Sequence, residues 1–348
     1  MTQGPSALAA IAEPPPDFAR ENILELLDRE YGLQGRLSPL VSERDQNFRL
    51  ETPDGKQFVV KIANAAEPLP ITDFQVQALQ RLADLECEVE VPRVLPAKNG
   101  SVLTTIGARE SEHRLRVVSY VPGIPLEGGL PDRRLARNMG RSLALIDAAL
   151  RDFTHPGESQ VLLWDMQRAA ELRPLVEHVP EELQPLVDDC IEVFMKQVMP
   201  VFSELRTQVI HNDLNPGNIL VSHSDPHAVA GVIDFGDMLR APLVVDVAIA
   251  ASYLRATDDG LATLGAFVDG FDSELPLDDR ERALLYDLVR TRLAATITIL
   301  YWRATARSAE DPYLQKALEE RASERFLRYL SHLGRDVFLE AVSAAKNS

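Results

Sequence analysis

The chain has 348 residues, of which 45% are hydrophobic and 26% charged, a composition typical of a soluble globular protein with room for two modest lobes. Its formal net charge of -17 argues against binding to nucleic acid or to an anionic membrane surface. Its two cysteines support no disulfide framework, and no signal peptide or membrane span is recognisable, so we expect a cytoplasmic protein.

The first third of the chain predicts a small, β-rich unit. Residues 1–16, rich in Ala and Pro, are expected to be a disordered tail, and Asp17 can cap a helix that runs to about Tyr31. A strand pair is predicted over Leu37–Leu50 and Lys56–Ile62, joined by the turn Thr52-Pro53-Asp54-Gly55. Further elements are a helix over Thr72–Leu85 and strands over Val89–Leu95, Ser101–Thr105 and Leu115–Val121.

After Val121-Pro122-Gly123 the chain is predominantly helical by spacing, apart from one β-hairpin whose strand residues run from Val209 to Ile233. Helices are predicted at about 132–152, 164–176, 181–205, 242–256, 259–273, 278–309 and 311–343.

The hairpin carries the most specific signal in the chain. His211-Asn212-Asp213-Leu214-Asn215-Pro216-Gly217-Asn218 has the pattern H-x-D-x-x-x-x-N, and Asp234-Phe235-Gly236 follows on the next predicted strand. Phosphoryl transfer requires a carboxylate near the attacking hydroxyl and oxygen ligands for Mg²⁺. Asp213 can take the first role, and Asn218 and Asp234 can take the second. We therefore predict an α+β, bilobal protein-kinase-like fold, with the N-lobe at 17–118, a hinge linker at 119–123 and the C-lobe at 124–348.

The donor nucleotide, ATP or GTP, is expected to meet three parts of the N-lobe. Lys61 lies in an apolar strand and can contact the phosphates, and Gln75 on the following helix, at the position of the usual glutamate, can hydrogen-bond Lys61 but carries no charge. The expected phosphate loop, residues 41–48, has no glycine, so Ser42, Arg44 and Asn47 are its candidate contacts. Ser119 and Val121 are in the linker, where the backbone reads the base.

These residues resemble the aminoglycoside phosphotransferase family, over nearly the whole chain after about residue 20. His211, Asp213, Asn215 and Asn218, and then the run Ile233-Asp234-Phe235-Gly236-Asp237-Met238, are similar to the hydroxylysine kinase branch of that family. The resemblance implies transfer of a phosphoryl group to the side-chain hydroxyl of 5-hydroxy-L-lysine. It also implies that Asp213 is the base, with His211 and Asn215 in its loop, that Asn218 and Asp234 bind Mg²⁺ and that Lys61 contacts phosphates.

The acceptor is expected to be a small molecule. Ala241-Pro242-Leu243-Val244 follows the Asp234 motif at once, leaving no room for the long activation segment of a protein kinase. Asp237 can hold an ammonium group, and Arg292 can bind a carboxylate. Other candidate acceptor contacts on the same predicted helix are Arg290, Tyr301 and Trp302. The alternatives are another amino alcohol as acceptor, such as homoserine, ethanolamine, choline or an aminoglycoside, and a catalytically silent nucleotide-binding module.

Overall fold

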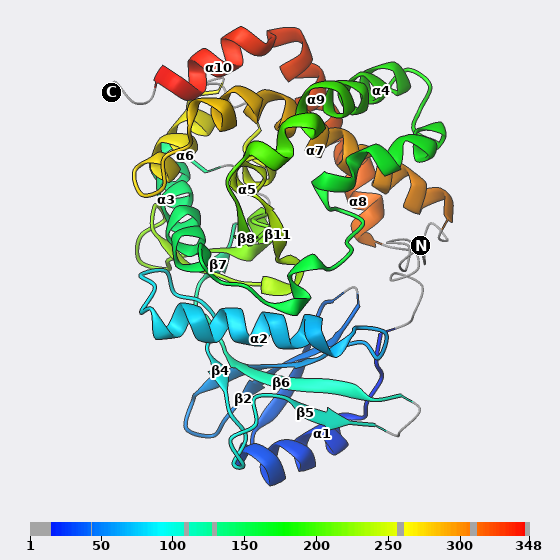
Figure 1. Cartoon of the computed structure of the whole chain (residues 1–348). Coiled ribbons are helices and arrows are strands. Elements are labelled where there is room, and N and C mark those ends of the chain that lie inside the picture. Colours follow the sequence, from blue (N-terminus) through cyan, green and yellow to red (C-terminus); the bar gives the residue numbers. More distant parts are fainter. Residues whose placement is uncertain are drawn as a thin grey trace.

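The structure is a computed structural model that describes residues 15–42, 44–107, 111–126, 131–255, 261–306 and 312–344. Figure 1 shows a sheet-containing part built from the first third of the chain and a larger helical part built from the rest. The predicted tail, apart from Pro15 and Pro16, lies outside the described residues.

A six-stranded antiparallel sheet forms the N-terminal part. Its strand order is β1-β2-β3-β6-β4, with β5 also paired to β6. The strands are β1 (Arg36–Leu40), β2 (Gln46–Glu51), β3 (Gln57–Ile62), β4 (Val94–Leu95), β5 (Thr104–Ile106) and β6 (His113–Ser119). The predicted single strand over Leu37–Leu50 is wrong, because the chain reverses after Leu40 and Arg36–Leu40 pairs with Asn47–Glu51.

The two faces of this sheet follow the alternation of its side chains. Phe48, Val60 and Val117 lie side by side in the register and are buried against α1 (Arg20–Leu26) and the π-helical turn Leu27–Tyr31. The first turn of α1 lacks the predicted Asp17 cap, since the helix begins after Ala19 with no side-chain cap. One residue along from the apolar row, a polar row made of Asn47, Lys61 and Arg116 crosses the same three strands on the opposite face.

Helix α2 (Leu69–Asp84) lies between the sheet and the helical part (Figure 1). It begins one turn before the predicted start at Thr72, and Phe74, Leu79 and Leu82 join the large core of the helical part. The sheet and the helices are therefore joined through a packed helix as well as through the chain at residues 119–123, which we keep as a proposed hinge.

The helical part consists of α3 (Arg133–Leu150), α4 (Gln184–Val193), α5 (Leu243–Ala251), α6 (Ala262–Asp272), α7 (Asp279–Ala306), α8 (Pro312–Glu320), α9 (Ala322–Leu333) and α10 (Arg335–Ala344). The predicted helix at 164–176 is a 3₁₀ helix, Met166–His178, which contains Pro174. The predicted segment 311–343 is three helices, because Arg321 and Gly334 have positive φ angles of 46° and 85° and break it twice. No helix in the described part of the chain is both long and apolar enough to cross a bilayer.

Two small sheets hold the predicted hairpin. Strand β9 (Ile219–Val221) pairs with β10 (Val229–Val232) and with β7 (Ile124–Pro125), whereas β8 (Thr207–Ile210) pairs with β11 (Leu239–Pro242). The loop after β8 and the loop after β10 lie together, since Asn212 in the first donates to the Asp237 carbonyl in the second, and the second contacts α2.

Candidate active site

Asp213 is held by the amides of its own loop. Asn215 Nδ2 and Asn218 Nδ2 donate to Asp213 Oδ2 at 3.0 and 2.9 Å, and Asn218 Nδ2 also donates to the Asp213 carbonyl at 2.9 Å. Burial, followed by the nearby Asp237 carboxylate, raises the pKa of Asp213 to about 8. A carboxylate with a raised pKa and a fixed orientation is suited to accept a proton from an alcohol.

His211 lies beneath this loop. It is fully buried and packs edge-on against Phe235, with ring centroids 4.8 Å apart. Its Nε2 lies 3.2 Å from the Ile233 carbonyl, and its Nδ1 accepts from the backbone N–H of Asp213 at 3.3 Å. Burial lowers the pKa of His211 to about 4, so the ring is neutral and joins the two loops as a positioning residue.

Two loop residues have left-handed backbones, Asn212 at φ 65° and Asp234 at φ 63°. The Asn212 N–H donates to Asp246 Oδ1 at 2.8 Å, and its Nδ2 donates to the Asp237 carbonyl at 2.9 Å. Non-glycine residues hold this conformation only where the surroundings impose it, and such positions cluster at functional sites. In the first loop, the hydrogen bonds of Asn212 hold its backbone in this conformation.

Asp234 pairs with Lys61 across the two parts of the molecule. Lys61 Nζ lies 3.2 Å from Asp234 Oδ1, and the Asp234 side chain remains 53% exposed. Lys61 is the main reason that the pKa of Asp234 falls to about 2, so the carboxylate is ionised throughout the physiological range. Lys61, Asp213, Asn218 and Asp234 thus come together as the motif predicts.

The predicted Lys61–Gln75 contact is wrong. Gln75 Oε1 accepts from Arg116 Nη2 instead, and Gln75 Nε2 donates to the Gly236 carbonyl at 3.5 Å. The register explains this exchange, because Arg116 lies directly opposite Lys61 on the neighbouring strand and the two cations take different partners. Gln75 therefore supports the turn after Asp234.

The turn between β1 and β2 reaches the same site. Arg44 Nη2 donates to Asp237 Oδ1 at 2.7 Å, and Ser42 Oγ accepts from the Asp45 N–H at 3.2 Å. Asn47 is part of the polar row beside Lys61, and its buried Oδ1 has no hydrogen-bond partner among the described residues. Asn47 is thus on the face of the sheet that carries Lys61, and Arg44 reaches the loop after Asp234, whereas the described contact of Ser42 is internal to the turn.

A buried cation lies beside the two carboxylates. The charge of Arg292, which is 3% exposed, acts on both Asp213 and Asp237, and its guanidinium hydrogen-bonds Tyr253. Arg292 Nη1 also donates to the Trp164 carbonyl at 3.1 Å, and the guanidinium lies 5.7 Å from the centre of the Trp164 ring. Burial alone would lower the pKa of Arg292, but Tyr253 and Asp213 outweigh it and raise the pKa.

The other acceptor candidates on α7 have different surroundings. Arg290 pairs with Asp189 at 2.8 Å, and the Tyr301 hydroxyl donates to Glu324 at 2.7 Å, so the described contacts of both lead to residues other than Asp213, and their acceptor roles stay predictions. At about 100° per residue, both positions lie roughly 160–180° around the helix from Arg292. Trp302 packs in the apolar group that contains Trp164, and its acceptor role stays a prediction.

Part of the linker between the two parts of the molecule is held by hydrogen bonds to the N-terminal sheet and its loops. The Ser119 N–H donates to the Arg93 carbonyl at 2.8 Å, and Ser119 Oγ accepts from the Arg93 N–H. Tyr120 N–H donates to the Gln57 carbonyl at 3.2 Å. Of the two linker residues predicted for the base, Val121 is the one whose backbone N–H has no such bond among the described contacts.

Sequence reasoning missed Tyr253, Arg116 and Gln160. Gln160 Nε2 donates to the Gly236 carbonyl at 3.2 Å and to the Met238 carbonyl, fixing the backbone around Asp237. Arg116 alone had a usable signal, a charge in the centre of an apolar strand opposite Lys61. Tyr253 and Gln160 lie far from the motifs in sequence, and no pattern connects them to the site.

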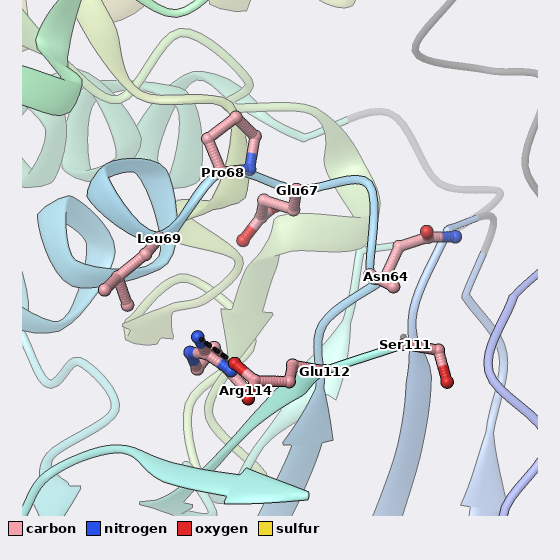
Figure 2. Close-up of a pocket in the computed structure, with 8 residues that line it drawn as sticks. Asn64, Glu67, Pro68, Leu69, Ser111, Glu112 and Arg114 are labelled. Carbon is pink, nitrogen blue, oxygen red and sulfur yellow. Dashed lines mark hydrogen bonds and ion pairs between the residues drawn. The ribbon is translucent and has the colours of Figure 1, made fainter. Parts of the chain in front are cut away.

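A separate hollow of about 320 Å³ lies beside the loop that leads into α2 (Figure 2). It is lined by Asn64, Ala65, Glu67, Pro68, Leu69, Ser111, Glu112 and Arg114. Figure 2 shows the Glu112–Arg114 pair on one side of it and the residues before α2 on the other. None of the motif residues lines this hollow, so it is distinct from the centre around Asp213.

The comparisons with known proteins agree with this geometry. Residues 36–292 match the model of the phosphotransferase enzyme family. The chain is 28% identical to hydroxylysine kinase of Xenopus laevis over 94% of both chains, and 26% identical to hydroxylysine kinase of Danio rerio over 93% of this chain and 94% of that one. It superposes with a TM-score of 0.68 and 16% identity on an amicoumacin kinase solved with AMP-PNP and Ca²⁺, covering 91% of this chain and 95% of that one. This match confirms the predicted bilobal, kinase-like fold.

Proposed function

Because the chain belongs to the phosphotransferase enzyme family, we propose that it transfers the γ-phosphoryl group of ATP or GTP to the side-chain hydroxyl of a free amino acid, 5-hydroxy-L-lysine in the first instance. The observation that carries the amino-acid acceptor is the buried cation Arg292 acting on Asp213 and Asp237. An acceptor with an ammonium, a carboxylate and a hydroxyl needs an acidic group, a cation and a base within one site. These three residues supply that set.

In this proposal Asp213 orients the acceptor hydroxyl and takes its proton as the oxygen attacks the γ-phosphorus. Asn215 and Asn218 hold one carboxylate oxygen of Asp213, which leaves the other to meet the hydroxyl. Most of the rate enhancement in such reactions comes from positioning and charge stabilisation, so the fixed orientation of Asp213 is as important as its basicity.

Asn218 and Asp234 fit a Mg²⁺ ion. Both N–H contacts of the Asn218 amide go to Asp213, so its oxygen is the atom left for a ligand, and the Asp234 carboxylate is ionised and half-exposed. Within the described ranges no three His, Cys, Asp or Glu side chains form a metal cage. A donor set of one amide and one carboxylate suits Mg²⁺, which keeps water and phosphate oxygens as its other ligands. When bound, Mg²⁺ would neutralise charge that develops on the transferred phosphoryl group.

The nucleotide is proposed to lie between the polar row of the N-terminal sheet and the Asp234 loop. Lys61 and Arg44 would meet the phosphates, and the backbone of Val121 would meet the base. The amicoumacin kinase of the same fold was solved with AMP-PNP, which supports a nucleoside triphosphate as donor.

A nucleotide-consumption screen tests the proposal. The protein is incubated with Mg²⁺ and ATP or GTP over a set of hydroxy amino acids and amino alcohols, and phosphorylated product is identified by mass. We expect 5-hydroxy-L-lysine to give the highest kcat/KM. Preference for ethanolamine or an aminoglycoside would replace the amino-acid acceptor, and the absence of turnover with every acceptor would favour a silent nucleotide-binding module.

Arg292→Met tests the carboxylate contact. Methionine keeps much of the side-chain volume but removes the charge, so we expect the KM for 5-hydroxy-L-lysine to rise at least about tenfold, or ~1.4 kcal/mol, the loss expected for one charge-assisted hydrogen bond. Steady-state kinetics with 5-hydroxy-L-lysine and with an acceptor that lacks the carboxylate measure the effect. The second acceptor should be little affected.

Arg290→Met is the matched control, because Arg290 is also buried on the same helix but pairs with Asp189 on another face. It should leave the KM of both acceptors within about twofold. An equal loss for both acceptors in the Arg292 variant, or an equal loss in the two variants, would assign Arg292 to packing alone.

A further inference from the structure

Two carboxyl groups meet beneath the catalytic loop without a cation. Asp147 on α3 and Asp246 on α5 are both fully buried. Asp246 receives two backbone hydrogen bonds at 2.8 Å, from the His211 N–H to Oδ2 and from the Asn212 N–H to Oδ1. The Asp147 carboxyl receives no hydrogen bond from any N–H or O–H group of the described residues, and the one side chain that acts on it is the Asp246 carboxyl.

A hydrogen bond between two carboxyl groups requires a proton on one of them. Asp246 accepts a backbone N–H at each oxygen, which stabilises its ionised form, whereas no N–H reaches the Asp147 carboxyl, so the shared proton belongs on Asp147 and Asp147 is the donor. Two ionised carboxylates in contact without solvent would repel each other strongly, and neither could be hydrated. These contacts therefore favour a neutral Asp147 next to a carboxylate at Asp246.

The surroundings contain nothing that would ionise Asp147. The catalytic loop faces the pair with two N–H groups and the neutral His211 ring, and β8 contributes the Gln208 amide, which donates to the Asp147 carbonyl at 2.7 Å. No Lys or Arg of the described residues acts on the pKa of either carboxyl. Burial, followed by the neighbouring carboxyl, raises the pKa of Asp147, and burial raises that of Asp246 as well.

We propose that Asp147 is a positioning residue that, as a permanently protonated acid, donates a hydrogen bond to Asp246 and thereby holds the backbone of His211 and Asn212, and with it Asp213, in the catalytic geometry. The inference concerns the loop and does not depend on which acceptor is phosphorylated. A shift of this backbone would act directly on the proposed base, because Asp213 follows Asn212 in the chain. A displacement of about 1 Å at a reacting group can cost on the order of 10²-fold in rate.

Two substitutions of Asp147 distinguish a role as a hydrogen-bond donor from a role as a charged group. Asp147→Asn keeps a hydrogen-bond donor of the same size without a titrating proton, whereas Asp147→Leu keeps the volume but leaves Asp246 with no donor on that side. With the acceptor that the screen identifies, we expect kcat of Asp147→Asn within about threefold of the natural protein and kcat of Asp147→Leu lower by at least about tenfold. The Kd for Mg²⁺-nucleotide should change less than threefold in both.

A second measurement needs no substrate and therefore tests the proposal even if the acceptor is wrong. An acid whose pKa is raised by folding stabilises the protein fully only below its unfolded pKa, and this contribution is lost as pH rises towards the folded pKa. The Tm of the natural protein should therefore fall more steeply between pH 5 and 9 than that of Asp147→Asn, so the Tm of Asp147→Asn minus the Tm of the natural protein should increase with pH. This arm also decides the question if Asp147→Leu does not fold.

Three results would overturn the proposal. One is unchanged kcat in a folded Asp147→Leu protein. Another is an equal loss of kcat in Asp147→Asn and Asp147→Leu, which would mean that an ionised carboxylate is needed. The third is a Tm difference between the natural protein and Asp147→Asn that stays constant across the pH range.

Discussion

Asp213→Asn is expected to lower kcat by about 10²–10⁴-fold while Mg²⁺-nucleotide binding stays close to that of the natural protein. The substitution keeps the shape of the side chain and one oxygen, but an amide cannot take the proton of the acceptor hydroxyl. In the natural protein the amides of Asn215 and Asn218 both donate to Asp213 Oδ2. In the variant the new amide oxygen can still accept a hydrogen bond from them, so the loop should keep its shape. Turnover with the best acceptor and nucleotide Kd by calorimetry provide the two readouts.

Asp225→Asn is the control, because Asp225 lies in the turn of the same hairpin, with a partly exposed side chain outside the proposed site. It should retain full turnover. Near-normal kcat for Asp213→Asn would remove Asp213 from the role of base, and a parallel loss of nucleotide affinity would indicate that the variant disturbs the metal side of the site.

Asp234→Ala is expected to weaken nucleotide binding only when Mg²⁺ is present, and to lower turnover by at least about 10²-fold, the cost of removing one preorganised electrostatic contact. Asp234 is the ionised member of the proposed ligand pair, and Mg²⁺ replaces a lost oxygen ligand reluctantly. Titrations of nucleotide with and without EDTA measure the metal-dependent part directly.

The metal-free titration is the internal control for this variant. Without Mg²⁺ the alanine protein should bind nucleotide no more weakly than the natural protein, because Lys61 loses its partner and becomes free to meet phosphate. If Mg²⁺ strengthens nucleotide binding equally in both proteins, Asp234 is not a metal ligand.

The predicted architecture and catalytic centre follow from short-range signals. The hairpin motif specifies residue types, spacing and strand context together, and the fold match confirms the architecture that it indicated. Helix positions were predicted well where an amphipathic period is strong, as in α2 and α3. Helix boundaries were predicted less well where a residue with a left-handed backbone interrupts that period. Arg321 is such a residue, and an arginine gives no indication in the sequence that its φ angle is 46°.

Contacts between distant elements were not predictable in the same way. Gln75 was assigned to Lys61 by alignment along α2, but strand register places Arg116 beside Lys61 and gives Arg116 to Gln75. Along α7 the charge of Arg292 acts on Asp213, whereas the described partners of Arg290 and Tyr301 are Asp189 and Glu324. The proximity of Asp147 and Asp246 could not be predicted from the sequence, because the two residues lie on helices about 100 residues apart in the chain.

The short connection after Asp237 has a consequence for control of the enzyme. Only Met238 to Pro242 lie between that residue and α5, and most of this stretch is strand β11, paired with β8. In protein kinases a long segment at this point is ordered by phosphorylation, which makes catalysis conditional on an earlier signal. Here the corresponding residues form a short strand that is paired with β8. The proposed catalytic loop therefore takes its geometry when the protein folds. Flux through such an enzyme follows the supply of its two substrates and not the history of a covalent mark on this segment.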